Sequence, residues 1–155
     1  MNDKDKTYEE AEGLVKDPDK LEKMLQKLEK KMEAIPKAGN ALAYVPLMVS
    51  LVRSYIKKEY NEVPVASIVA IVAALLYVLS PADIIPDFLP AGYVDDAVIV
   101  AGCLVLVRTD LEDYRIWRKD AGKEFEDLPD YKEINEVAKE NHKYLSGFFK
   151  GKKDK

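Results

Sequence analysis

Four aspartates, Asp83, Asp87, Asp95 and Asp96, are the residues whose type and spacing in this sequence could do chemistry. They lie within a stretch of 14 residues, and no other charged residue occurs between positions 63 and 107. Carboxylates that are held close together repel one another unless a cation or protons neutralise them. Calcium and magnesium prefer such oxygen ligands, and paired carboxylates can also act as general acid and base. Any function of this chain has to explain this acidic segment.

A structural role for the same aspartates is the first alternative. Ser80 suits the N-cap of a short helical turn, Pro81 suits its first position, and Asp83 falls where a carboxylate meets free backbone N–H groups. Asp95 or Asp96 can begin the next helix in the same way, and each such cap stabilises a helix by about 1 kcal/mol. Capping explains Ser80 and Pro81 well, but it explains the adjacent pair of aspartates less well.

Binding of a cation, binding of a basic partner protein, and catalysis are the functional alternatives. A calcium or magnesium ion would neutralise the carboxylates, although their spacing matches no EF-hand loop. Catalysis has the least support, because no histidine, phosphate-binding glycine loop or activated nucleophile lies near the segment. Cys103 lies in an apolar run and fits a buried, inert thiol, and His142 lies far along the chain. We therefore expect no enzyme activity and no resident cofactor, and the identity of any metal stays open.

Two apolar helices must hold the acidic segment. Residues 64–79 have no polar face beyond Ser67, and a helix that is apolar all round is buried in a protein core or in lipid. One continuous helix is predicted over residues 95–120, and its first half, residues 97–107, is wholly apolar. The result is a helical hairpin, residues 63–107, with an acidic, proline-rich connection. The residues that prevent a continuous helix through the connection are Pro81, Pro86, Pro90 and Gly92.

Amphipathic helices are predicted on both sides of the hairpin. The chain divides into a charged N-terminal helical segment (1–40), a helical core that opens with a helix over 41–60 (41–120), and a C-terminal helix with a basic tail (121–155). The first segment carries a heptad stripe that packs onto the protein's own body or mediates self-association. This stripe, residues 21–35, consists of Leu21, Leu25, Leu28, Met32 and Ile35. No alternating strand pattern occurs, so the sequence predicts an all-α protein, a small helical bundle around the hairpin.

The connection and the helix ends beside it carry a specific motif. Its members are Tyr77, Ser80, Pro81, Asp83, Pro86, Asp87, Pro90, Gly92, Asp95 and Asp96. This pattern resembles the YkvA-like family, a bacterial domain of unknown function, over roughly residues 64–107. The resemblance implies a helical hairpin that is often regarded as membrane-associated. It implies no activity, since none is established for the family.

Composition and charge exclude several classes of protein. The chain has 155 residues, and 48% of them are hydrophobic, which is enough for one folded domain. Its net charge of −4, with no basic stripe, argues against nucleic-acid binding. One cysteine excludes an intrachain disulfide framework, and one histidine excludes the usual zinc site. Residues 1–20 lack the pattern of a secretion signal, so classical secretion is not expected.

The sequence leaves open whether the hairpin lies in lipid or in a protein core. The apolar run 63–79 has 17 residues and would form a helix about 25 Å long, against a bilayer core of about 30 Å. Lysines and arginines flank the hairpin while its tip is acidic, as insertion from the cytoplasmic side would require. With the family resemblance, this favours a membrane-associated interaction or scaffold module on the cytoplasmic side. The alternative is a soluble cytoplasmic bundle whose acidic turn binds a divalent cation or a basic partner.

Overall fold

The computed structural model describes residues 3–33, 41–79, 96–120 and 131–149, and within these ranges the regular structure is entirely helical. The prediction of an all-α bundle is therefore confirmed. In chain order the helices are α1 (Asp3–Val15), α2 (Pro18–Met32), the short 3-10 helix η1 (Ala41–Tyr44), α3 (Val45–Ile56), α4 (Val65–Leu79), α6 (Asp96–Leu106), α7 (Arg108–Asp120), α8 (Tyr131–Glu140) and α9 (His142–Phe148).

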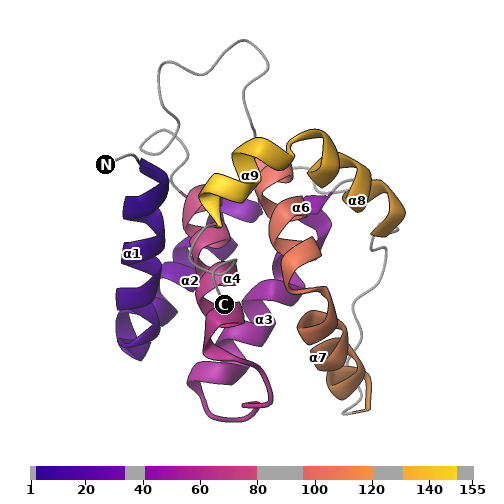
Figure 1. Cartoon of the computed structure of the whole chain (residues 1–155). Coiled ribbons are helices and arrows are strands. Elements are labelled where there is room, and N and C mark those ends of the chain that lie inside the picture. The colour runs from indigo at the N-terminus through magenta and orange to yellow at the C-terminus, as the bar shows by residue number, and fades with distance from the viewer. Residues whose placement is uncertain (1–2, 34–40, 80–95, 121–130, 150–155) are drawn as a thin grey trace.

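Helix α4 occupies the centre of the bundle, with α1 on one side and α6 on the other (Figure 1). Helices α2 and α3 also pack against it. Every residue from Ser67 to Val78 is buried as a result. An apolar helix without a polar face requires apolar contacts all round, and here other helices of the same chain supply them.

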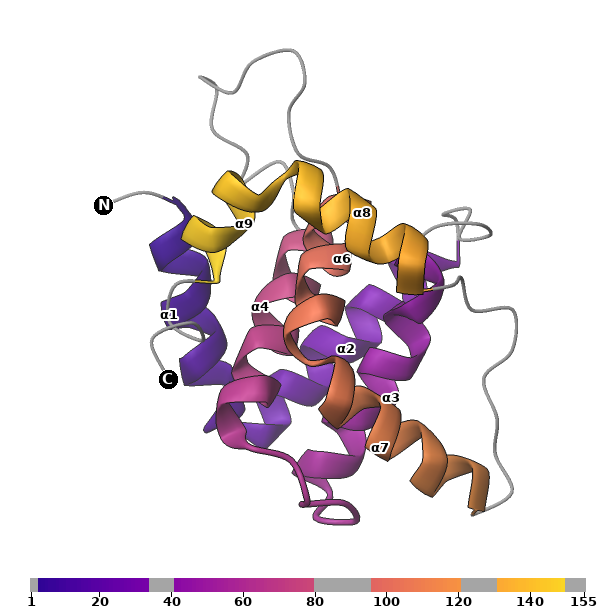
Figure 2. The same ribbon diagram turned by 45° about the vertical axis from the view of Figure 1, so that its right-hand side comes forward.

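Helices α8 and α9 run across one end of the α4–α6 pair, and α7 continues from the other end of α6 to lie beside α3 (Figure 2). The contact between α6 and α9 depends on Gly102. A Cβ atom at this position would lie only 2.7 Å from a terminal methyl carbon of Leu145. The missing side chain therefore allows α9 to approach the α6 backbone closely.

The predicted helix over 95–120 is in fact two helices, and the prediction of one continuous helix is wrong. The backbone hydrogen bond from Leu111 N to Val107 O, 2.9 Å long, carries the chain from α6 into α7. Polar contacts then hold α7 against α3 and α4. Ser67 Oγ donates to Asp110 Oδ2 at 2.5 Å, and Tyr114 shares hydrogen bonds with serines of α3. The change of direction at Val107 brings these groups together.

Two further helix predictions need correction. The region 41–60 begins with the 3-10 helix η1, and α3 starts only at Val45, because Pro46 lacks the N–H that a longer α-helix would need and fits the first turn instead. Helix α3 ends at Ile56, and Lys58 then adopts a left-handed φ of 62°. The C-terminal helix is interrupted at Asn141, whose side-chain amide donates to Val137 O at 2.9 Å, at the end of α8.

The heptad stripe lies on α2 and packs inside the protein. Asp17 caps this helix by accepting a hydrogen bond from Lys20 N, and Pro18 occupies the first turn. Self-association through the stripe would require its side chains to leave the core, and it stays a prediction. Ile35 lies outside the described residues, and the stripe residues that are buried in the chain's own core are Leu21, Leu25, Leu28 and Met32.

Candidate functional site

The acidic connection was the candidate site in the sequence, and most of it lies outside the described residues. Asp83, Asp87 and Asp95 fall in the undescribed range 80–95. Asp96 is the first residue of α6, in agreement with its predicted position at a helix start, but its side chain is not described. The motif residues that share the undescribed range are Ser80, Pro81, Pro86, Pro90 and Gly92. Convergence of the four carboxylates on a cation therefore stays a prediction.

The end of α4 that leads into the connection is held by a lysine. Lys31 Nζ of α2 donates to Val78 O at 2.5 Å and to Leu79 O at 3.1 Å. These carbonyls lie in the last turn of α4, where backbone acceptors have no intrahelical partner and the helix dipole is negative. A cation from the N-terminal segment thus stabilises the helix end that precedes the acidic segment, a contact that the sequence did not predict.

Tyr77 is the motif residue whose side chain the structure describes in full. It is completely buried on α4, among the largest side chains of the core. A buried tyrosine at this position anchors the end of α4 within the bundle.

A polar and aromatic cluster joins α7 to α3. The Tyr114 hydroxyl lies 2.5 Å from Ser50 Oγ and 2.8 Å from Ser54 Oγ. The Tyr114 ring stacks on Trp117 at 5.6 Å between centroids, and Tyr60 packs edge-on against Tyr114 at 5.0 Å. Burial raises the pKa of Tyr60, and Asp113 adds to the effect. The cluster holds α3 and α7 together.

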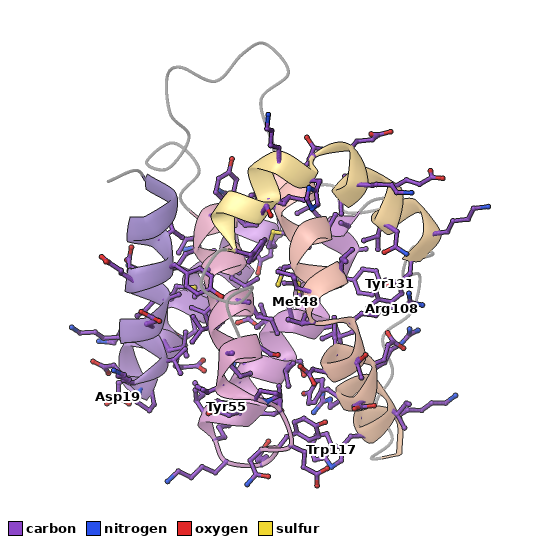
Figure 3. All side chains as sticks on the ribbon, viewed as in Figure 1. Asp19, Met48, Tyr55, Arg108, Trp117 and Tyr131 are labelled. Atoms are coloured by element: carbon purple, nitrogen blue, oxygen red, sulfur yellow. The ribbon has the colours of Figure 1, made fainter. Side chains whose placement is uncertain are left out.

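A second cluster joins α7 to α8, where Arg108 and Tyr131 lie side by side (Figure 3). The Arg108 guanidinium lies 4.4 Å from the centroid of the Tyr131 ring, a cation–π contact. Tyr44 packs against the same ring at 5.4 Å. Burial raises the pKa of Tyr131 strongly, and the neighbouring Glu112 raises it further. The phenol therefore stays neutral and cannot serve as a base near neutral pH.

Arg53 forms the main ion-pair network between α2 and α3. Its guanidinium is 3.0 Å from Glu22 Oε2 and 2.8 Å from Glu29 Oε2. The hydrogen bonds from Arg53 lower the pKa of Glu22, and those to Glu29 and Glu22 raise the pKa of Arg53. The network fixes the pair of helices that covers one side of α4.

An apolar groove lies between α6 and the helices α8 and α9, and we name it the α6–α9 groove. Its volume is about 230 Å³. Val105 and Leu106, at the end of α6, are exposed by 41% and 38%. The sequence predicted an apolar helix at α6 but not that part of it faces solvent. The groove is lined by Gly102, Val105, Leu106, Ala138, His142, Leu145, Ser146 and Phe149.

Metal-ligating side chains do not gather in the parts of the chain that the structure describes. No group of three His, Cys, Asp or Glu residues within these parts could hold a metal ion. Cys103 is a buried thiol on α6, as predicted, and His142 is exposed at the start of α9. None of the described helices is long and apolar enough to cross a membrane.

Comparison with known proteins supports the family resemblance. Residues 67–102 match the family model described as a protein of unknown function, DUF1232. The chain is 30% identical over 78 residues to a Bacillus subtilis protein named "Uncharacterized membrane protein YkvA", covering 50% of this chain and 74% of that protein. No solved structure gives a significant match. The matched region spans α4, the acidic connection and most of α6, and the chain belongs to the YkvA-like DUF1232 family, whose function is unknown.

Proposed function

We propose that this protein is a non-enzymatic interaction module that associates with the surface of a membrane, while the α4–α6 pair remains its protein core. The α6–α9 groove carries this proposal. Exposed apolar side chains at a groove are typical of sites that contact a partner or a lipid surface. The relative from Bacillus subtilis is named a membrane protein. Surface attachment reconciles that name with the burial of α4.

Burial argues for attachment from outside rather than insertion of the hairpin. The side chains of α4 from Ser67 to Val78 are all covered by neighbouring helices of this chain. To enter lipid, α4 would have to lose those contacts, and lipid tails would offer little in exchange because they are no more apolar than the core it leaves. Val105 and Leu106 are already exposed and can meet lipid without any rearrangement.

Charges around the groove support a modest preference for anionic lipid. Lys139 and Lys143 are exposed on α8 and α9, which border it, and Arg108 is exposed at the start of α7. Glu136 lies in the neighbouring depression that Val105 and Lys139 also line, and it offsets part of the positive charge. We therefore expect apolar contact to contribute more to vesicle binding than electrostatic attraction does, so added salt should weaken binding only modestly.

Flotation of the protein with vesicles of phosphatidylcholine and phosphatidylglycerol tests the proposal. Leu106→Glu places a charge in the groove and should reduce the bound fraction by about tenfold, since a carboxylate at an apolar contact is costly to desolvate. Val65→Glu is the matched control, because Val65 is 54% exposed on α4 but lies away from the groove. Equal loss in both variants, or no loss in either, would contradict the groove as the contact site.

The cation or basic partner predicted at the acidic connection is the alternative function. It stays a prediction, as does the cytoplasmic side for the membrane contact. Titration with calcium chloride and with magnesium chloride tests the cation directly. A saturable heat of cation binding that disappears in the Asp87→Asn/Asp95→Asn double variant would support cation binding, rather than vesicle binding, as the function.

A further inference from the structure

The outward side of α2 carries a row of exposed lysines, which we name the lysine flank. Successive lysines are three or four residues apart, a spacing that places side chains one helical turn apart on the same face. The row is about 15 Å long, at about 1.5 Å per residue. The lysine flank consists of Lys20, Lys23, Lys27 and Lys30, all of which are exposed.

The carboxylates of α2 do not neutralise this row. Glu22 and Glu29 lie toward α3, where both accept hydrogen bonds from Arg53. Asp19 lies in the first turn of α2, at one end of the row. The sequence alone indicated no basic stripe, because these acidic residues alternate with the lysines along the chain. Helical geometry separates the two kinds of charge, and Arg53 holds the acidic side chains on the side of α3.

The lysines of the flank form no ion pair with any residue that the structure describes. Lys23 and Lys27 are four residues apart on one helix, an arrangement in which like charges repel and weaken the helix. An acidic group that lay along the row would pair with these cations and relieve their repulsion. The lysine flank is thus a surface whose charge calls for an anionic partner.

The size and surroundings of the flank favour a short acidic segment of a protein over a nucleic acid. About five residues of extended chain, at about 3.3 Å each, cover the row. A longer polyanion would run onto a chain whose net charge is −4. Helix α1, which packs beside α2, exposes Glu9, Glu10 and Glu12. The flank also contains no arginine, the residue that binds phosphate through paired hydrogen bonds.

A lipid surface fits the flank less well than a protein does. The apolar side chains of α2 are buried in the core, so none accompanies the lysines to insert among lipid headgroups. The α6–α9 groove lies where α8 and α9 cross one end of the bundle, whereas α2 lies behind α4 (Figures 1 and 2). Contact of the groove with a membrane therefore does not require α2 to touch lipid.

We propose that the lysine flank binds a short acidic segment of a partner protein, whose aspartate and glutamate side chains pair with Lys20, Lys23, Lys27 and Lys30. The contact is between exposed charges, so added salt weakens it. This activity goes beyond vesicle binding, since the chain would hold an acidic partner while its groove contacts lipid. The flank and the groove share no residue, so each activity can fail without the other.

Fluorescence anisotropy of a labelled octaglutamate peptide, titrated with the full chain at low salt, tests the proposal. The Lys23→Gln/Lys27→Gln variant should bind the peptide about fivefold more weakly, since each exposed ion pair contributes modestly. The matched control is Lys57→Gln/Lys119→Gln, which makes the same change in net charge at exposed lysines outside the flank. The control should bind the peptide as the unaltered protein does.

A charge-preserving variant separates loss of charge from damage to α2. Lys23→Arg/Lys27→Arg keeps both cations and should retain the affinity for octaglutamate. Absence of binding to the unaltered protein would overturn the proposal, as would equal loss in the two glutamine variants or loss in the arginine variant. Two further outcomes would overturn the protein partner: tighter binding of a short DNA duplex than of the peptide, or loss of vesicle flotation in Lys23→Gln/Lys27→Gln.

Discussion

Helices α4 and α6 are both apolar, yet they meet their surroundings differently. Every residue of α4 from Ser67 to Val78 is buried, because helices pack on it from several sides. Helix α6 lies nearer the edge of the bundle, and its last two residues, Val105 and Leu106, are exposed. Hydrophobicity alone therefore does not decide whether a helix is core or contact surface. What decides it is whether the neighbouring helices cover the whole circumference, as they do on α4, or leave one part open, as they do at Val105 and Leu106 on α6.

Truncation of equivalent leucines on the two helices should give the largest contrast. Leu75→Ala removes a fully buried side chain from α4 and should lower the free energy of unfolding by about 2–5 kcal/mol. Leu106→Ala removes a side chain that is 38% exposed on α6 and should cost less than about 1 kcal/mol. Urea denaturation followed by circular dichroism measures both. Equal costs would show that α6 is as deeply buried as α4.

The covered half of α6 can be probed at Gly102. Gly102→Ala forces a Cβ against Leu145, and the overlap should cost about 1–3 kcal/mol, partly offset by about 1 kcal/mol of improved helix propensity. A double-mutant cycle with Leu145→Ala separates the two effects. We expect the pair to be coupled by about 0.5–3 kcal/mol, since Leu145→Ala removes the overlap. Additive effects would mean that α9 does not pack on Gly102.

The smallest expected effect on the free energy of unfolding comes from the ion pairs that join α2 to α3 beside α4. Arg53 lowers the pKa of Glu22 in the folded protein, so this pair stabilises the fold above the ordinary pKa of a glutamate. The stabilisation is lost as the pH falls through the lowered pKa. Since both side chains are about a quarter exposed, the effect should be about 0.2–1 kcal/mol.

Comparison of the free energy of unfolding at pH 7 and pH 3 in the unaltered protein and in Arg53→Gln measures this effect. The variant should lose less stability on acidification than the unaltered protein does. A variant with the same pH dependence would mean that Glu22 titrates as it does in the unfolded chain.

The sequence predicted the helical class and that α4 would be covered on all sides, because a helix without a polar face has few alternatives, but it left open whether protein or lipid would cover it. The break at Val107 was missed because neither proline nor glycine marks it. It depends on contacts of α7 with distant residues, such as those between Tyr114 and Ser50, which local periodicity does not encode. The α6–α9 groove was missed for the same reason, since its walls come from three separate helices. The role of the four aspartates, as helix caps or as a site for a cation or a basic partner, remains a prediction from sequence.

Membrane fractionation followed by a carbonate wash tests most directly whether α4 and α6 stay within the protein when it associates with a membrane. We expect the untagged protein to sediment with membranes and to be released by the carbonate wash, since in the proposed function only the surface groove touches lipid. Release should also follow Leu106→Glu without the wash. Retention of the unaltered protein after the wash would contradict a protein core at α4 and would place the hairpin in the bilayer.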